Sequence, residues 1–240
     1  MVLILISSRM IFYNLWLEQD VVKSARLSAS QLGCLKNEKK PFWEKAYKDK
    51  NTNVFGKTSR EFYDLVRRLR KGASVLDLGC GEGRNALFLA EKGYKVTAID
   101  ISRAAVEKLK YLAKREGCPI DLAIADMRYL TLKNSYDLII AHGSLHLIER
   151  NCWKALIPTL KAATNDGGYN AIAVFTDSIG PPEDLKDFCV GLFREGELFE
   201  YYSDWIEHFK DSYIIEEKHP GSPKHQHSLN KIVAQKPVDT

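Results

Sequence analysis

The 240-residue chain lacks the sequence features of several protein classes. Its five cysteines form no CxxC pair, which argues against a disulfide framework or a zinc finger and indicates reduced thiols in a cytoplasmic protein. No run of Lys or Arg is long enough to bind a row of phosphates, and the net charge is only +4. The apolar segment 1–6 is shorter than the core of a signal peptide or the roughly 20 residues of a spanning helix. We therefore expect no nucleic-acid partner and no membrane.

The chain also lacks an internal repeat, and its length fits one domain with a short extension better than two domains. Hydrophobic residues make up 45% of the sequence, which is enough to build a sizeable core. Residues 1–40 show no sustained hydrophobic period. We predict a loosely packed N-terminal extension over residues 1–40 and a single domain over residues 41–240.

The rest of the sequence alternates short apolar runs with amphipathic segments. Buried strands are predicted at residues 74–78, 95–99, 122–124, 136–141 and 169–175. A helix from Ser59 to Gly72 is predicted before them, and further helices at 85–92, 102–117 and 153–163. Segments 212–217 and 228–234 follow without room for a helix between them, so they must be antiparallel. The pattern predicts an α/β fold with a seven-stranded, mostly parallel sheet, helices on both faces and a C-terminal antiparallel hairpin.

A glycine-rich turn follows the first predicted strand and precedes a helix. Gly79, Gly81 and Gly83 alternate there, so the backbone can pass close to a ligand without side-chain clashes. A nicotinamide dinucleotide needs the pattern GxGxxG, but Arg84 occupies the place of the third glycine. The tighter GxGxG turn suits S-adenosylmethionine, which carries an amino-acid tail and no phosphate.

Acidic residues follow the next two strands at positions that suit a nucleoside. Asp100 ends the second strand, 21 residues after Gly79, where a carboxylate accepts hydrogen bonds from both ribose hydroxyls. Asp126 is placed to accept from the adenine amine, while Met127 packs on the ring. One such acid is often only a helix cap, but the ordered set favours a nucleoside site. The predicted cofactor-binding residues are Asp77, Gly79, Cys80, Gly81, Gly83, Arg84, Asn85, Asp100, Ile101, Asp126, Met127 and His142.

These motifs resemble those of the class I S-adenosylmethionine-dependent methyltransferases, and among them the tellurite-resistance (TehB-like) family. The resemblance runs from about Phe42 to Lys236 and includes the segment DLGCGEGRN at 77–85. It also includes the Gly167-Gly-Tyr169 turn and the segment 193–198, followed by Tyr201, Tyr202 and Trp205. The resemblance implies a Rossmann-like methyltransferase fold, a small-molecule acceptor and a monomer or homodimer. Pro220 and Ser228 depart from the family pattern. This departure bears on the identity of the acceptor and not on that of the donor.

The acceptor side is predicted from topology and from the resemblance. His142 follows the fourth strand, beside the expected methyl group, and Arg194 is placed to hold an anionic acceptor. His219 and His225, with His227, flank the terminal hairpin, which the family topology places back toward the sheet centre. We predict His142, Arg194, His219 and His225 as catalytic residues. Alternatively, the histidines only hold the hairpin together; a metal site is not expected, because no carboxylate or cysteine with ligand spacing completes their set.

Three functions fit this set of motifs. The first is methyl transfer to a soft small molecule such as tellurite, selenite or a thiol, which needs little help from a base. The second is O- or N-methylation of a metabolite or protein, which needs a general base. The third is a non-catalytic module that binds S-adenosylmethionine, which the intact glycine and acid motifs disfavour. A dehydrogenase is disfavoured by Arg84.

Overall fold

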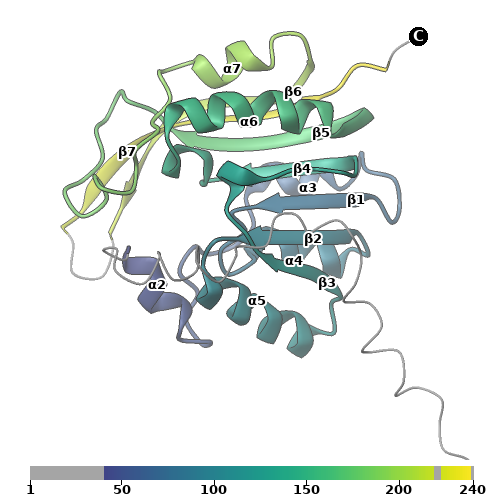
Figure 1. The fold of residues 1–240 in the computed structure, drawn as a ribbon, viewed down its shortest axis with the longest axis horizontal. Helices are drawn as coiled ribbons and strands as arrows, with labels where there is room; N and C mark the ends of the chain where they lie inside the picture. Colours follow the sequence, from purple (N-terminus) through teal and green to yellow (C-terminus); the bar gives the residue numbers. More distant parts are fainter. Residues whose placement is uncertain (1–40, 219–222, 239–240) are drawn as a thin grey trace, which may run out of the picture.

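The computed structural model of the chain describes residues 41–218 and 223–238 (Figure 1). Its seven strands are β1 (Ser74–Leu78), β2 (Lys95–Asp100), β3 (Ile120–Ile124), β4 (Tyr136–His142), β5 (Thr164–Phe175), β6 (Ile206–Glu217) and β7 (His225–Gln235). They form one sheet in the order β3-β2-β1-β4-β5-β7-β6. The first five strands are parallel, and β7 is antiparallel to both β5 and β6. The predicted fold class is therefore confirmed.

Helices cover both faces of the sheet (Figure 1). They are α2 (Phe42–Tyr47), α3 (Arg60–Leu65), α4 (Arg84–Glu91), α5 (Arg103–Glu116), α6 (Arg150–Ala162) and α7 (Glu197–Tyr201), with 3₁₀ turns η2 (Met127–Tyr129) and η3 (Leu145–Leu147). In the described residues, no helix is long and apolar enough to cross a membrane.

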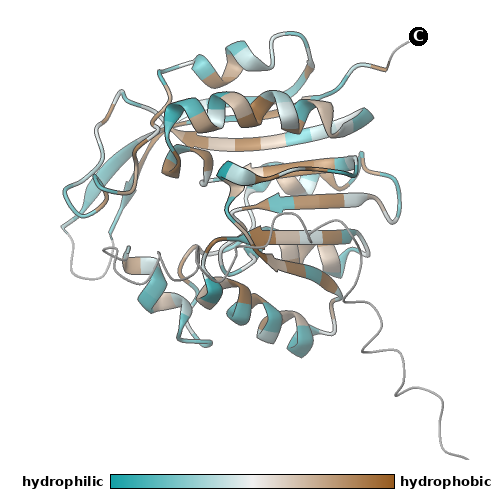
Figure 2. Cartoon of the chain, in the orientation of Figure 1, coloured by the Kyte–Doolittle hydropathy of each residue, from teal (hydrophilic) through white to brown (hydrophobic). Residues whose placement is uncertain are grey.

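Alternation along the strands produces two hydrophobic cores. In β1, Leu76 and Leu78 join the core that contains α6 and α7, whereas Val75 joins the core that contains α3 and α4. The same alternation in β4 sends Ile139 to the first core and Ile140 to the second. Figure 2 shows this distribution of hydropathy: the central strands are largely hydrophobic, while α2 and the outer end of β7 are largely hydrophilic. Parallel strands covered on both faces leave only the loops at their ends for binding.

Two predicted boundaries, the end of α3 and the start of β5, are wrong. Helix α3 ends at Leu65 rather than at Gly72, and residues 66–69 form turns. Strand β5 begins at Thr164, so Gly167 and Gly168 lie inside the strand as an irregularity of its pairing with β4. A Cβ on Gly168 would come within 2.7 Å of a backbone carbonyl oxygen, which explains why this irregularity needs glycine.

The hairpin of β6 and β7 does not return to the sheet centre as expected. β7 pairs with the free side of β5, and β6 lies outside it as the edge strand. The physical reason is that β4 is already paired with β1 and β5, so only the outer side of β5 offers unpaired backbone groups. Residues 1–40 and His219 lie outside the described residues, and the predictions made for them stay predictions.

Candidate active site

The glycine turn joins the carboxyl end of β1 to the start of α4. Gly79, Gly81 and Gly83 all have positive φ, at 70°, 55° and 88°. A Cβ on Gly79 would lie 2.3 Å from the Cβ of Ser144, and one on Gly83 would lie 2.2 Å from a methyl carbon of Leu109. Glycine is therefore required here both by backbone conformation and by space. The turn is therefore packed closely against other residues of the chain, which fixes its backbone beside the strand-end acids.

Two carboxyl groups, the buried one of Asp77 and the half-buried one of Asp100, lie behind the turn. Asp100 accepts hydrogen bonds from the backbone amides of Gly81 and Ser102, each at 2.8 Å. Burial raises the pKa of Asp100 to about 6 and, despite the nearby Arg84 charge, the pKa of Asp77 to about 7. Each oxygen of Asp100 retains a second lone pair after these bonds. Hydroxyl and ammonium donors, such as those of S-adenosylmethionine, fit this pair of acceptors.

The predicted adenine-binding residues are placed as follows. Asp126 is buried, and its carboxylate is held by the Arg128 side chain, with Nη2 2.6 Å and Nε 2.9 Å from Oδ2. The terminal carbon of Met127 would lie 3.3 Å from a Cβ on Gly79, so this side chain borders the glycine turn. Ile101 is 40% exposed beside Asp100 and offers an apolar contact. The sequence analysis did not predict a role for Arg128. Its position two residues after the predicted site acid Asp126 could have indicated this ion pair.

His142 lies in a buried polar chain that the sequence did not reveal. Its Nδ1 is 3.0 Å from Nη2 of Arg84, and its Nε2 is 2.9 Å from Oε1 of Glu61. A guanidinium only donates, so Nδ1 accepts and Nε2–H donates to the carboxylate. Burial lowers the pKa of His142, which is therefore neutral at pH 7, while Lys231 stands 3.2 Å from Glu61. Both ring nitrogens are engaged, so His142 links α3 with α4, and Glu61 extends the chain to Lys231 of β7.

Residues before the first strand lie against the glycine turn. Oε1 of Glu82 accepts hydrogen bonds from the backbone amides of residues 54 and 55 at 2.7 and 2.9 Å. The other carboxylate oxygen of Glu82 forms an ion pair of 2.7 Å with Lys108, whose side chain is 1% exposed. Tyr47 of α2 is buried, with its hydroxyl oxygen 2.8 Å from where a Cβ of Gly81 would be. The site thus includes a wall from residues 47–55, which sequence periodicity did not indicate.

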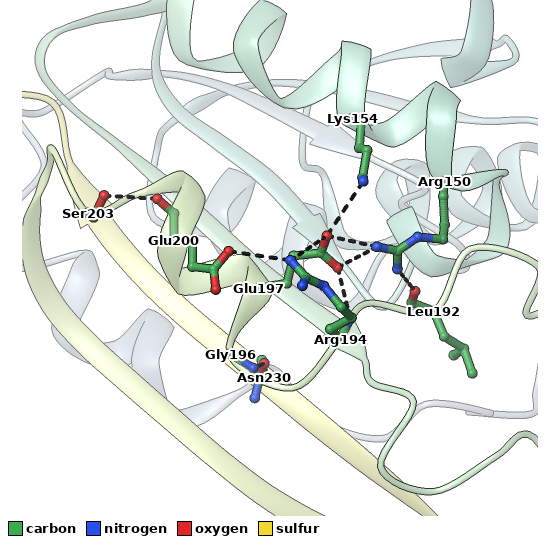
Figure 3. A network of polar contacts seen from close by, with 9 residues as sticks. All are labelled: Arg150, Lys154, Leu192, Arg194, Gly196, Glu197, Glu200, Ser203 and Asn230. Carbon is green, nitrogen blue, oxygen red and sulfur yellow. Dashed lines mark hydrogen bonds and ion pairs between the residues drawn. The ribbon is translucent and has the colours of Figure 1, made fainter.

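Arg194 contacts carboxylates of its own chain rather than the glycine turn (Figure 3). Its side chain is 62% exposed, and its Nη2 lies 3.6 Å from both Glu197 and Glu200. Glu197 is buried and accepts two hydrogen bonds from Arg150, at 2.8 and 2.9 Å. These ion pairs connect α6 with α7, so the predicted role of Arg194 would require its release from them.

The structure brings the predicted hairpin histidines together at the carboxyl end of β5. The ring of His227 stacks on Phe175 with centroids 4.1 Å apart, and His146 stacks on Phe175 at 4.2 Å. His225 lies next to His227, with ring centroids 4.9 Å apart. His146 is a core residue, since it is 2% exposed and burial lowers its pKa to about 3. Of the hairpin histidines, His225 and His227 lie together in the described part of the chain, and the acceptor-side roles of His142, Arg194, His219 and His225 stay predictions.

Comparison with known proteins agrees with this geometry. The family model described as tellurite resistance protein TehB matches residues 37–220. The chain belongs to the TehB family. A probable S-adenosyl-L-methionine-dependent methyltransferase TehB of Haemophilus influenzae is 36% identical over 133 residues, which cover 55% of this chain and 45% of that protein. The crystal structure of TehB from the same species has a TM-score of 0.69 at 27% identity and covers 80% of this chain and 67% of that one.

The family also has relatives with other names. The cypemycin N-terminal methyltransferase of a Streptomyces species is 30% identical over 149 residues, covering 55% of this chain and 58% of that protein. In each of these curated relatives the matched region is less than two thirds of the full length. This TehB-family chain therefore spans only about half the length of each of these relatives.

Proposed function

We propose that this TehB-family protein transfers a methyl group from S-adenosylmethionine to a small-molecule acceptor. The observation that carries the proposal is the glycine turn with the buried carboxyl group of Asp77 and the half-buried carboxyl group of Asp100 behind it. Relatives in the family bear the name of S-adenosyl-L-methionine-dependent methyltransferases, which supports the same donor here. Four described cysteines are free thiols, which agrees with a cytoplasmic location. We expect a monomer or homodimer.

Donor binding follows from the chemistry of the residues present. Asp100 accepts from the ribose hydroxyls, and the backbone of Gly79 and Gly81 passes along the amino-acid tail. Met127 and Ile101 enclose the adenine ring, with Asp126 near its amine. The bound donor supplies a methyl group already activated on a sulfonium. The residues therefore act mainly by positioning the two reactants and excluding water.

The acceptor is best matched by a soft chalcogen compound such as tellurite, selenite or a thiolate. An acceptor lone pair bonds to the methyl carbon, the carbon–sulfur bond breaks, and its electron pair stays on sulfur to give S-adenosylhomocysteine. His142 already has a hydrogen bond at each ring nitrogen, which favours an acceptor that loses no proton to it. We propose that His225 contacts this acceptor; the acceptor-side role of His219, which lies outside the described residues, stays a prediction. Arg194 would join only after leaving Glu197.

N-methylation of a peptide or metabolite is the second candidate, favoured by the similarity to the cypemycin N-terminal methyltransferase. An amine acceptor must lose a proton, and a hairpin histidine is the candidate base. This alternative predicts that replacing the histidine lowers turnover of an amine acceptor at neutral pH, where an imidazole can take a proton, and changes it little at low pH, where the imidazole is already protonated. The chalcogen proposal predicts no such dependence on a base.

The test is a transfer assay with the full chain and methyl-labelled S-adenosylmethionine. Tellurite, selenite, small thiols and peptides with a free amino terminus serve as acceptors, and Asp100→Ala serves as the donor-site control. We expect label in a chalcogen or thiol product, and much less with the Asp100 variant. Label in the peptide alone would establish the second candidate. Donor binding without transfer to any acceptor, including cell extract, would contradict both and indicate a binding module.

A further inference from the structure

Three side chains at the outer end of the hairpin have the composition of a metal site. Glu217 is the last residue of β6, and it is the register partner of His225, the first residue of β7. His227 lies two residues further along β7 and so on the same face as His225. One ligand atom from each residue lies within 4.8 Å of the other two. Residues separated in sequence by the hairpin turn are thus collected into one set of two imidazoles and one carboxylate.

Hydrogen bonding prepares His225 for such a role. Its Nδ1 is 3.0 Å from the carbonyl oxygen of Pro223, and because a carbonyl only accepts, Nδ1 carries the proton. The lone pair of His225 is therefore on Nε2, which is shielded from solvent. A backbone carbonyl that fixes the tautomer of a histidine is the usual outer shell of a metal ligand.

The second imidazole is held by stacking. The ring of His227 lies nearly parallel to Phe175, at 11° and 4.1 Å between centroids, and its Nε2 is also shielded from solvent. Its Nε2 is 3.8 Å from Oε2 of Glu217, so carboxylate and imidazole already face each other. In a tetrahedral zinc site, each ligand atom lies about 2.0–2.2 Å from the metal, and two ligand atoms lie about 3.3 Å from each other. Small side-chain rotations would bring the three ligand atoms to these distances.

We propose that Glu217, His225 and His227 bind a divalent transition-metal ion of the zinc class. Two nitrogen ligands and one carboxylate suit Zn²⁺, Co²⁺ and related ions, whereas Mg²⁺ and Ca²⁺ prefer oxygen ligands alone. Three protein ligands leave a further coordination position for water or an anion. Sequence spacing did not indicate this site, because the carboxylate that completes it comes from β6 through strand pairing.

The position of the cluster relates it to the active site. Phe175 ends β5, so the cluster lies at the carboxyl edge of the parallel strands, the same edge as the glycine turn (Figure 1). The outer end of β7 is also largely hydrophilic, unlike the central strands (Figure 2). The proposal concerns ion binding alone and does not depend on which acceptor is methylated.

Calorimetry with Zn²⁺ on chelator-treated full chain tests the proposal. We expect saturable one-to-one binding for the parent and no comparable binding of Mg²⁺. Glu217→Gln and His225→Gln should each weaken Zn²⁺ affinity by more than about tenfold, since loss of a mere supporting partner already costs 10- to 100-fold in metal sites. His227 is left intact because its stacking on Phe175 contributes to packing. Folding of both variants is checked by thermal melting without metal.

Two matched controls come from the same strands. Glu216→Gln removes the neighbouring carboxylate, which pairs with Lys224, and His208→Gln removes a histidine of β6 that bonds Gln235. Both should keep the parent affinity within about twofold. Bound Co²⁺ should show the visible bands of nitrogen and oxygen ligation without thiolate charge transfer, which separates this site from the cysteines. Absence of Zn²⁺ binding, or equal affinity in the His225 variant, would overturn the proposal whether or not methyl transfer occurs.

Discussion

The proposed donor half, around the glycine turn, and the proposed acceptor half, around the terminal hairpin, are built from sequence in different ways. On the donor side, Gly79 and Asp100 sit at the ends of adjacent parallel strands, and each position is defined by its own local motif. On the acceptor side, Glu217 meets His225 only through the antiparallel pairing of β6 with β7. Local motifs therefore identify the donor half, while strand pairing assembles the acceptor half. Substitutions in each half should reveal this difference.

The largest expected effect is on the donor side, from Gly79→Ala. Its Cβ would lie 2.3 Å from that of Ser144 at a φ of 70°, so overpacking and left-handed strain combine. We expect the free energy of unfolding to fall by about 2–4 kcal/mol and donor binding to be lost. Thermal melting and calorimetric titration with S-adenosylhomocysteine measure the two effects.

Gly93→Ala is the matched control for backbone strain. Gly93 has a φ of 84°, but no heavy atom lies within 4 Å of its Cβ position. This variant should lose only about 1 kcal/mol of stability and keep parent donor affinity. If both variants lose the same amount, close approach at the turn is not what requires glycine.

A smaller effect is expected from Asp77→Asn in the absence of donor. Burial raises the pKa of Asp77 to about 7 from an ordinary value near 3.8. Between these pH values the folded protein holds a proton that the unfolded chain has released, so stability falls as pH rises from about 4 to 7. The amide has no such titration, and we expect the variant to be more stable than the parent by about 2 kcal/mol at pH 7. Urea unfolding at pH 5 and pH 7 measures it; an unchanged pH slope would disprove this origin.

The smallest effect is expected on the acceptor side, from Arg194→Ala. This exposed guanidinium makes ion pairs of 3.6 Å, so its loss should change stability by less than about 1 kcal/mol. Arg150→Ala should cost about 1–3 kcal/mol, because buried Glu197 loses its bidentate partner (Figure 3). Chemical denaturation compares the two variants. A rise in acceptor KM for the Arg194 variant alone would show that this arginine binds the acceptor.

The strands up to β5 and the glycine turn were predictable because each depends on residues close in sequence. Apolar runs bounded by glycine define parallel strands, and the Ser102 cap and the Gly117 end of α5 are both as predicted. The place of the hairpin was not predictable from its own residues, since it depends on which strand of the sheet has a free side. The wall around Tyr47 and the Glu61–His142 pair were not predicted from the sequence either. Their only sequence signal is a polar side chain on an otherwise apolar face.

Donor binding by the parent and by Asp100→Ala tests the central claim most directly. Calorimetry with S-adenosylhomocysteine measures it without any assumption about the acceptor. The account predicts clear binding by the parent and a loss of about 1–3 kcal/mol in the variant, because the ribose hydroxyls lose a charged acceptor. Equal affinity in the two proteins, or preference of the parent for a nicotinamide dinucleotide, would contradict it.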